Sequence, residues 1–340
     1  MAFPWNVYTL ALASAGLCSL VSLPVWRAWC IRVGLVDDPG HRKIHSAPIP
    51  LAGGFAVLSG IVLPLACGVA LLHWHGLGAG SAQPIIYGIG RRATQLAALA
   101  MGAFGMVLLG AWDDKRELRA LPKFVGQFLI ASMVAASGVR ITLFVPNVVF
   151  SYAVTVLWIL TVTNAVNFMD NMNGLCAGMG MIAAACFGLG AASSGQYLVA
   201  LLAFVVSGAL LGFLPYNFPR ASAFLGDAGS HLVGYLLAVL AILPHFYSRT
   251  HPSSLAVLKP LLILAVPLGD LVWVVVLRWR LGQPVYVGDN NHLSHRLVRR
   301  GYSRTLAVLL IWLLTAITGV FAVAPRSAFG FWRETRTSSR

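Results

Sequence analysis

The sequence predicts an all-α membrane protein, a polytopic bundle of about ten transmembrane helices. Of its 340 residues, 58% are hydrophobic and only 10% are charged, whereas about a quarter of a soluble domain is charged. Apolar runs recur along nearly the whole chain, and the mean hydropathy is +0.80. These observations exclude an ordinary soluble enzyme. They predict one membrane domain over residues 1–325, followed by a short basic C-terminal tail over 326–340.

Ten segments of about 20 residues each are long enough to cross a bilayer as helices. In chain order they lie near residues 7–26, 51–74, 93–112, 124–139, 148–166, 174–192, 196–215, 230–248, 256–277 and 305–324. The fourth and sixth carry the weakest signal. The first is expected to be a retained helix rather than a signal peptide, because no basic residue precedes it and no clear cleavage site follows it.

The basic residues indicate how the bundle is oriented. When the loops are assigned alternately to two sides, 15 of the 24 lysines and arginines fall on one side. Cytoplasmic loops of membrane proteins are enriched in these residues, so this side is expected in the cytoplasm and both termini outside. The same distribution accounts for the net charge of +14, and no nucleic-acid partner is expected.

Most acidic residues fall on the same expected face. Acidic side chains are costly in a bilayer, so those near the spans are expected to be functional or to lie at loop ends. Eight of the ten lie in or beside the cytoplasmic loops: Asp37, Asp38, Asp113, Asp114, Glu117, Asp170, Asp227 and Asp289. Asp270 lies within the ninth expected span, where it either lines a cavity or pairs with a basic residue on a neighbouring helix.

Asp113 and Asp114 directly follow the third expected span. Adjacent carboxylates repel each other, and such a pair favours a bound cation or a raised pKa suited to base chemistry. The alternative is a solvated loop start that Lys115 and Arg116 stabilise.

The segment from Thr163 to Leu175 places three asparagines and an aspartate between two apolar spans. Asn167 and Asp170 are three residues apart, so on a helix they would share one face and offer oxygen ligands to a hard cation. The alternative is a polar capping turn, because Asn and Asp favour caps and Gly174 can end a helix.

A glycine-rich turn opens the eighth expected span, with the sequence Gly226-Asp227-Ala-Gly229-Ser230. The free N–H groups at a helix N-terminus suit a phosphate. A carboxylate such as Asp227 is out of place in an anion site unless a metal ion lies between the two. The alternative is an ordinary turn with an N-cap.

Two basic loops offer donors for phosphate oxygens. His292, His295 and Arg296 lie in an arginine-rich cytoplasmic loop, where arginine and protonated histidine suit phosphate binding; a zinc site and contact with anionic lipid headgroups are the alternatives. The loop before the second span contains Arg42, Lys43 and His45 and could contact a lipid phosphate. The cytoplasmic bias of basic residues also accounts for Arg42 and Lys43.

Together, in this order and on one expected face, these segments resemble the polyprenyl-phosphate N-acetylhexosamine-1-phosphate transferase family, which is glycosyltransferase family 4. The match covers roughly residues 35–305. The residues that carry it are Asp38-Pro39, Arg42-Lys43, His45, Pro48 and Gly53-Gly54; Asp113-Asp114, Leu118, Lys123 and Gln127; Asn164-Ala165, Asn167-Phe168, Asp170 and Gly174-Leu175; Phe224, Gly226-Asp227 and Gly229-Ser230; and His292, His295, Arg296 and Leu297.

The resemblance implies a reaction in the bacterial cytoplasmic (inner) membrane. A sugar 1-phosphate, by expectation GlcNAc-1-phosphate, would pass from a UDP-HexNAc donor to undecaprenyl phosphate. UMP would leave, and the product would be the first lipid-diphosphate intermediate of a cell-envelope glycan. The resemblance also implies Mg²⁺ as cofactor, with Mn²⁺ as the alternative, and it is compatible with a homodimer. Direct attack by the lipid phosphate and a covalent aspartyl intermediate both fit the residues.

The resemblance further implies a role for each matched position. Asp170 and Asp227 would hold the metal ion, with Asn167 as a further ligand. Asp113, or the pair Asp113 and Asp114, would activate or position the acceptor phosphate. The remaining positions would bind substrate: Lys123, His292, His295 and Arg296 the diphosphate oxygens, Asn173 the uracil, and Arg42, Lys43 and His45 the lipid phosphate.

The chain departs from the family pattern at two places. The sequence Asp170-Asn171-Met172-Asn173-Gly174 replaces the commoner Asp-Gly-x-Asp-Gly, and Ser294 stands where a middle histidine is usual. The three consecutive histidines typical of the branch that uses UDP-N-acetylmuramoyl-pentapeptide are absent, which favours UDP-N-acetylglucosamine. The competing hypotheses are a membrane transporter and a non-catalytic relative that binds lipid phosphate; an enzyme requires Asp113, Asp170 and Asp227 to line one cleft.

Overall fold

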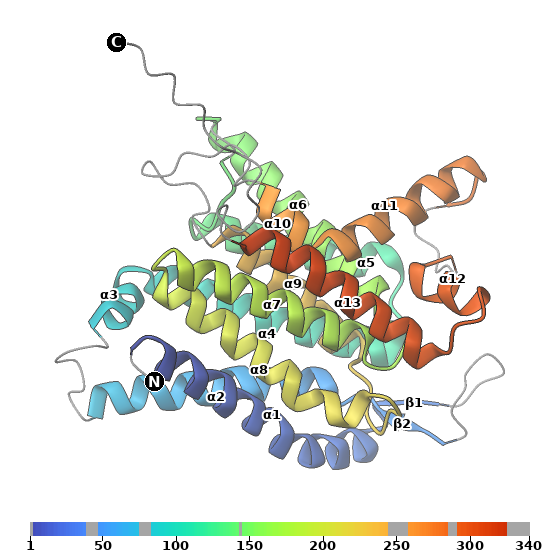
Figure 1. Ribbon diagram of the computed structural model, residues 1–340, viewed down its shortest axis with the longest axis horizontal. Helices are drawn as coiled ribbons and strands as arrows, with labels where there is room; N and C mark the ends of the chain where they lie inside the picture. The colour runs from blue at the N-terminus through green and yellow to red at the C-terminus, as the bar shows by residue number, and fades with distance from the viewer. Residues whose placement is uncertain are drawn as a thin grey trace, which may run out of the picture.

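The computed structural model describes residues 3–38, 47–74, 83–142, 145–243, 258–284 and 291–324. Within these residues the chain is almost entirely helical (Figure 1). The helices are α1 (Trp5–Val33), α2 (Gly53–Trp74), α3 (Gln83–Arg91), α4 (Ala93–Arg116), α5 (Ala120–Ala136), α6 (Val148–Phe168), α7 (Leu175–Ser193), α8 (Tyr197–Asn217), α9 (Gly226–Ile242), α10 (Leu258–Ile263), α11 (Ala265–Arg280), α12 (Leu293–Arg299) and α13 (Arg304–Val323). Two short strands, β1 (Val36–Asp37) and β2 (Ile49–Pro50), form an antiparallel pair.

The predicted all-α membrane fold is confirmed. Each of the ten expected spans coincides with a helix, although the ninth is divided at Leu264 into α10 and α11. In the described part of the chain, seven helices are long and apolar enough to cross a membrane, namely α1, α2, α4, α6, α7, α8 and α13. The helices α5 and α9 are apolar but shorter, so the count of about ten spans stays a prediction.

Two helices that the hydropathy pattern did not indicate are α3 and α12, of nine and seven residues. Both are too short to span a bilayer. In Figure 1 they lie at opposite ends of the bundle, and α12 shares its end with β1 and β2. The expected basic tail over 326–340 lies outside the described residues.

The bundle is built around α7, α8 and α9. In the apolar windows of α7 and α8, 72% of residues are buried, compared with 22% in α1, so α1 lies at the periphery. The buried helix α9 packs against α4, α6, α2 and α7. Residues at the start of α9 therefore lie inside the protein rather than against lipid.

Small residues let the outer helix α1 approach the central helix α8. A side-chain carbon added at Gly208 would collide with the carbonyl oxygen of Leu12, and one at Gly212 with that of Gly16. The Gly208/Gly212 pair thus lets the two backbones approach closely, as small-residue motifs of this kind permit close helix crossings. In the same way Gly178 accommodates the indole of Trp312 on α13.

Four helix ends meet near the start of α9: the C-terminal ends of α4 and α6 and the N-terminal ends of α5 and α9. A glycine is required where α4 crosses α9, because a side chain at Gly110 would collide with the backbone of Asp227 and Ala228. The chain entering α2 is also attached here, since the Gly53 and Gly54 amides donate to the carbonyls of Phe224 and Leu225 at 2.9 and 3.1 Å. Polar residues far apart in sequence are thereby brought together.

Candidate active site

A cleft of about 820 Å³ opens where these helix ends meet. Its lining contains six acidic side chains but, among the described residues, only one lysine and no arginine. The polar lining residues are Asp37, Asp38, Asp113, Asp114, Glu117, Lys123, Gln127, Thr161, Asn164, Asn167 and Asp227. An excess of carboxylates in a partly enclosed site attracts cations.

A lysine joins the carboxylates of α4 and α9. Lys123 Nζ on α5 lies 2.7 Å from Asp113 Oδ2 and 3.2 Å from Asp227 Oδ2. Asp113 is buried, and its other oxygen, Oδ1, accepts the backbone N–H of Leu118 at 2.9 Å. Asp113 and Asp227 thus lie at one site and are arranged to hold positive charge between them; Asp170, the third residue that the enzyme hypothesis requires there, is not among the lining residues of the described chain.

Asp114 has different surroundings from its neighbour. Its Oδ1 accepts the backbone N–H of Asp227 at 2.8 Å, and its Oδ2 accepts that of Ala228 at 3.1 Å. Free N–H groups at a helix start are commonly satisfied by a carboxylate in this way. Asp114 therefore caps α9 from a neighbouring helix and fixes the backbone that presents Asp227.

Asn167 supports Asp227 from α6. Its Nδ2 donates to Asp227 Oδ1 at 2.6 Å and to Ser230 Oγ at 2.8 Å. One turn earlier on α6, Asn164 Nδ2 donates to the buried Gln127 Oε1 at 2.7 Å and so ties α6 to α5. The amide group of Asn167 thus orients the Asp227 carboxylate, and its expected role as a metal ligand stays a prediction.

Asp170 lies just beyond α6, and it is not among the cleft-lining residues of the described chain. Burial, together with the nearby carboxylates of Asp227 and Asp114, raises its pKa to about 8. A carboxyl with such a pKa holds a proton at neutral pH unless a cation displaces it. Its effect on a bound cation would therefore depend on pH.

Both alternatives for Asp270 hold: it lines a second hollow of about 260 Å³, and it pairs with a basic residue. Asp270 Oδ2 lies 2.6 Å from His292 Nδ1, and Asp270 Oδ1 accepts the N–H of Leu293 at 2.6 Å. Both side chains are buried. The ring of His292 lies 5.9 Å from that of Phe168, which lines the cleft. Because Asp270 holds Nδ1, the other ring nitrogen, Nε2, is left to contact a ligand.

The other residues of this loop lie on α12, where they have separate surroundings. The guanidinium of Arg296 lies over the ring of Trp273 at 4.2 Å, beside the same hollow of about 260 Å³. Burial lowers the pKa of His295, and the nearby charges of His292, Arg299 and Arg304 lower it further. His295 is therefore neutral at pH 7 and needs a bound anion to become a cationic donor.

The remaining expected substrate ligands have the following positions. Asn173 Nδ2 donates to the carbonyl of Pro219 at 3.3 Å, which places it on the loop between α6 and α7 beside the start of the segment after α8. The expected lipid-phosphate ligands Arg42, Lys43 and His45 lie outside the described residues, as does Asp289.

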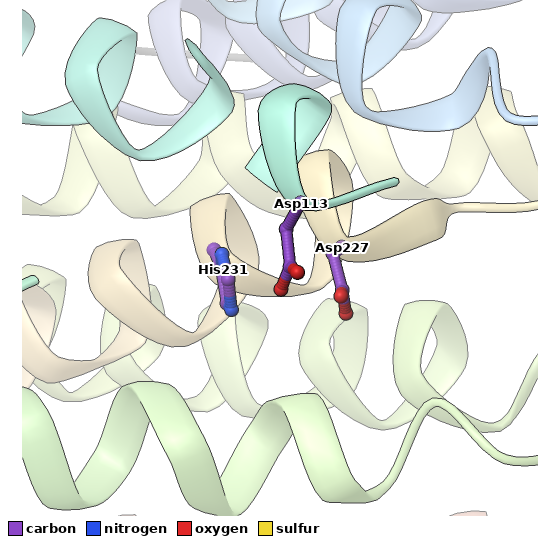
Figure 2. A group of neighbouring side chains, drawn as sticks. All are labelled: Asp113, Asp227 and His231. Carbon is purple, nitrogen blue, oxygen red and sulfur yellow. The ribbon is translucent and has the colours of Figure 1, made fainter. Parts of the chain in front are cut away.

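One residue of the site was missed in the sequence. His231 lies on α9 one turn after Asp227, and Figure 2 shows its ring beside the carboxylates of Asp113 and Asp227. One potential ligand atom from each of the three residues lies within 4.8 Å of the others. Only the spacing of four residues from Asp227, which places both side chains on one helical face, could have indicated it.

Fold and site together define a class of protein: a helical membrane protein with a buried acidic site at converging helix ends, where a charged substrate and a cation can meet. Comparison with known proteins gives the family. Residues 96–245 match the glycosyl transferase family 4 model. The chain belongs to this family, as its motifs indicated, and it is an enzyme of the transferase type.

Named relatives align along most of the chain. The probable undecaprenyl-phosphate N-acetylglucosaminyl 1-phosphate transferase of Bacillus subtilis (strain 168) is 34% identical over 320 residues, which cover 92% of this chain and 83% of that protein. The decaprenyl-phosphate N-acetylglucosaminephosphotransferase of Mycobacterium tuberculosis (strain ATCC 25618 / H37Rv) is 33% identical, covering 93% and 81%. An undecaprenyl-phosphate alpha-N-acetylglucosaminyl 1-phosphate transferase of Yersinia pestis is 28% identical, covering 90% and 81%.

Proposed function

We propose that this enzyme transfers GlcNAc-1-phosphate from UDP-GlcNAc to undecaprenyl phosphate and releases UMP. The observation that carries the proposal is the cluster of Asp113, Lys123 and Asp227 in an acidic cleft at converging helix ends. The names of the relatives support the polyprenyl phosphate acceptor and the N-acetylglucosaminyl group. The reaction would take place at the cytoplasmic face of a bacterial inner membrane, where the basic loops are expected to lie.

The reaction forms one bond and breaks one. An oxygen of the acceptor phosphate attacks the β-phosphorus of the UDP-sugar, and the bond from this phosphorus to the bridging oxygen breaks, so that UMP leaves with the electron pair. Asp113 would accept the proton of the acceptor phosphate. Lys123, which contacts Asp113, would hold this phosphate in place. Asp113 contacts Lys123 and the Leu118 amide, and we propose that it positions the acceptor phosphate for direct attack rather than forming a covalent aspartyl intermediate.

The site suits a divalent cation. Asp113 and Asp227 supply two carboxylates, and His231 supplies ring nitrogens that have no hydrogen-bond partner among the described residues. Asp227 would hold the ion, Asn167 would keep Asp227 oriented, and Asp170 would contribute its charge once deprotonated. A bound Mg²⁺ or Mn²⁺ would neutralise the diphosphate of the nucleotide sugar.

The basic residues around the cleft would bind the remaining phosphate charge. Lys123 already lies between the two carboxylates, and His292, held by Asp270, adjoins the cleft through Phe168. His295 and Arg296 on α12, and Arg42, Lys43 and His45 in the loop before α2, are proposed as further phosphate ligands. Asn173 is proposed to bind uracil, and a homodimer is a proposal that mass photometry in detergent would test.

The test is a UMP-release assay on the full chain purified in detergent. UDP-GlcNAc and undecaprenyl phosphate are supplied with Mg²⁺, with Mn²⁺, and with a chelator, and Asp227→Ala is the control. Release that needs both metal and acceptor, and that the control lacks, is the expected result. A folded protein that releases no UMP with any UDP-HexNAc yet binds undecaprenyl phosphate would instead be a non-catalytic lipid-binding relative.

A further inference from the structure

His231 is a buried side chain without a structural explanation. It is fully buried in the second turn of α9, and neither ring nitrogen has a hydrogen-bond partner among the described residues. A buried polar group without a partner destabilises the folded protein, and most such groups in native proteins are satisfied. Leucine or phenylalanine would fill this position without that cost, so the imidazole requires another reason.

The reason lies in what the ring faces. The side chains of Asp113, Asp227 and His231 lie side by side in Figure 2, and one potential ligand atom of each lies within 4.8 Å of the others. Ligand atoms bound to a single ion at about 2.0–2.2 Å lie at most about 4.4 Å apart. Three ligands cannot all lie opposite one another, so the most separated pair would have to close by about 1 Å to share one ion, and the Lys123 ammonium that bridges the two carboxylates would have to move aside.

The two carboxylates are also constrained by the helices that carry them. Asp227 is fixed by Asn167 at 2.6 Å, and its backbone by Asp114 at 2.8 Å. Asp113 is fixed by the Leu118 amide at 2.9 Å. His231 is on the same helix as Asp227, four residues later, so the relative position of these two groups is set by the helix itself. Such support is typical of a metal-binding site.

We propose that His231 is a nitrogen ligand to the cation held by Asp113 and Asp227, and that it raises the affinity of this site for transition-metal ions relative to Mg²⁺. The chemistry of the ligands gives the direction. Mg²⁺ strongly prefers oxygen ligands, whereas imidazole is a ligand that first-row transition metals accept. The inference deepens the proposed function, because it concerns the metal ion of the same cleft.

The experiment uses Mn²⁺ as the probe and the full chain in detergent. Pulsed electron paramagnetic resonance detects nitrogen bound to Mn²⁺, and growth with ¹⁵N-labelled histidine identifies the nitrogen as histidine. The expected result is a nitrogen coupling that changes with the isotope and is absent in His231→Leu. The Kd for Mn²⁺ should rise roughly tenfold or more in this variant, while the Kd for Mg²⁺ should change much less. Asp227→Ala is the control that should lose both ions.

Stability measurements separate a ligand from a packing residue. In chelator, His231→Leu should be at least as stable as the parent chain, because it removes unsatisfied buried nitrogens; the thermal stabilisation by Mn²⁺ should be lost. Mn²⁺ bound without histidine coupling, no Mn²⁺ binding, or equal Mn²⁺ affinity in His231→Leu would each overturn the proposal. UMP release is measured separately, so histidine coupling without UMP release would refute only the transferase, and UMP release without coupling only the ligand role of His231.

Discussion

Two departures from the family pattern contact each other. Ser294, which stands where a histidine is usual, is fully buried, and its Oγ donates to Asn171 Oδ1 at 2.7 Å. Asn171 is itself the residue that replaces the usual glycine after Asp170. The two unusual residues thus form one hydrogen bond, which joins α12 to the loop that carries Asp170.

We therefore expect Ser294 and Asn171 to be energetically coupled. Ser294→Ala and Asn171→Gly should each lower stability by about 1 kcal/mol, and the double variant should lose less than the sum of the two. Thermal unfolding of the four proteins in detergent gives the coupling. If the loss in the double variant equalled the sum of the two single losses, the hydrogen bond between Ser294 and Asn171 would contribute no coupling energy to stability.

Asp270 positions His292, and this gives a prediction about activity. Asp270→Asn removes the charge that holds Nδ1, so the ring can rotate or adopt the other tautomer. We expect kcat/KM for UMP release to fall roughly tenfold to a hundredfold, and a second change, His292→Ala, to add little to that loss. If Asp270→Asn and His292→Ala multiplied their effects, the two residues would act independently.

The raised pKa of Asp170 predicts that cation binding depends on pH. Its carboxyl, with a pKa of about 8, is protonated at pH 7, so cation binding beside it displaces a proton and strengthens as pH rises from 6 to 8. The affinity should increase up to about tenfold per pH unit for one proton displaced. Titrations with Mn²⁺ at pH 6, 7 and 8 measure this slope, and Asp170→Asn should flatten it.

The raised pKa of Asp170 also predicts how the stability of the folded protein changes with pH. A carboxyl whose pKa is higher in the folded than in the unfolded protein favours folding below its unfolded pKa, near 4, and loses this contribution as pH rises toward 8. The folded protein in chelator should thus be less stable at pH 8 than at pH 6 as far as Asp170 is concerned. Asp170→Asn should reduce the difference in melting temperature between the two pH values.

At the scale of elements, the start of α9 is the structure on which the site depends. The amides of its second and third residues are satisfied by Asp114 of α4, and its preceding residues are paired with the chain entering α2. Asp114→Ala should lower stability by about 0.5–2 kcal/mol, as loss of a helix cap does. It should also lower kcat, because Asp227 lies in the first turn of α9, and the position of this turn would change once the Asp114 carboxylate is lost. Loss of activity in Asp114→Asn with an unchanged melting temperature would instead indicate a catalytic role.

The sequence predicted the helices well because hydropathy records which segments suit lipid. It missed α3 and α12, which are short and not apolar throughout, and it did not indicate the break at Leu264. It placed Asp113, Lys123 and Asp227 at one site because their motifs all fall at span ends on one face. It missed His231, since a single histidine in an apolar helix gives no signal until its neighbours on other helices are known.

The pairing of Asp270 with His292 shows the same limit. An acid within a span indicates a polar partner or a cavity, but the sequence does not say which. The partner lies on a different element, and only the packing of α12 against the end of the bundle brings the two together. Tertiary contacts of this kind have no local pattern that a sequence could display.

At the scale of the whole molecule, the cleft lies at one end of the bundle, and the glycine-mediated packing of α1 on α8 is not part of it. The four helices that form the cleft are the central α9 and its neighbours, so the acids lie inside the protein at helix ends. A transporter would place such groups near the membrane midplane. An enzyme that acts on one soluble and one lipid-bound substrate needs them where the protein meets the aqueous phase.

This arrangement predicts which loops face the cytoplasm. The helix α4, Ala93–Arg116, is long and apolar enough to be one span, so we expect the exposed Arg91 before it and the exposed Arg119 after it on opposite sides of the membrane. The cleft lies at the Arg119 end, and the excess of basic residues predicts that this end faces the cytoplasm. UDP-sugars are soluble and charged, so a cleft on this side has direct access to a cytoplasmic donor.

Single cysteines at these two positions test the orientation. In intact spheroplasts, a membrane-impermeant maleimide should label Arg91→Cys but not Arg119→Cys, and in inside-out vesicles the pattern should reverse. The unsubstituted chain, with its five cysteines, gives the background labelling, and UMP release shows that each variant is folded. Labelling of Arg119→Cys in intact spheroplasts would place the acidic cleft outside the cell and contradict a cytoplasmic UDP-sugar as donor.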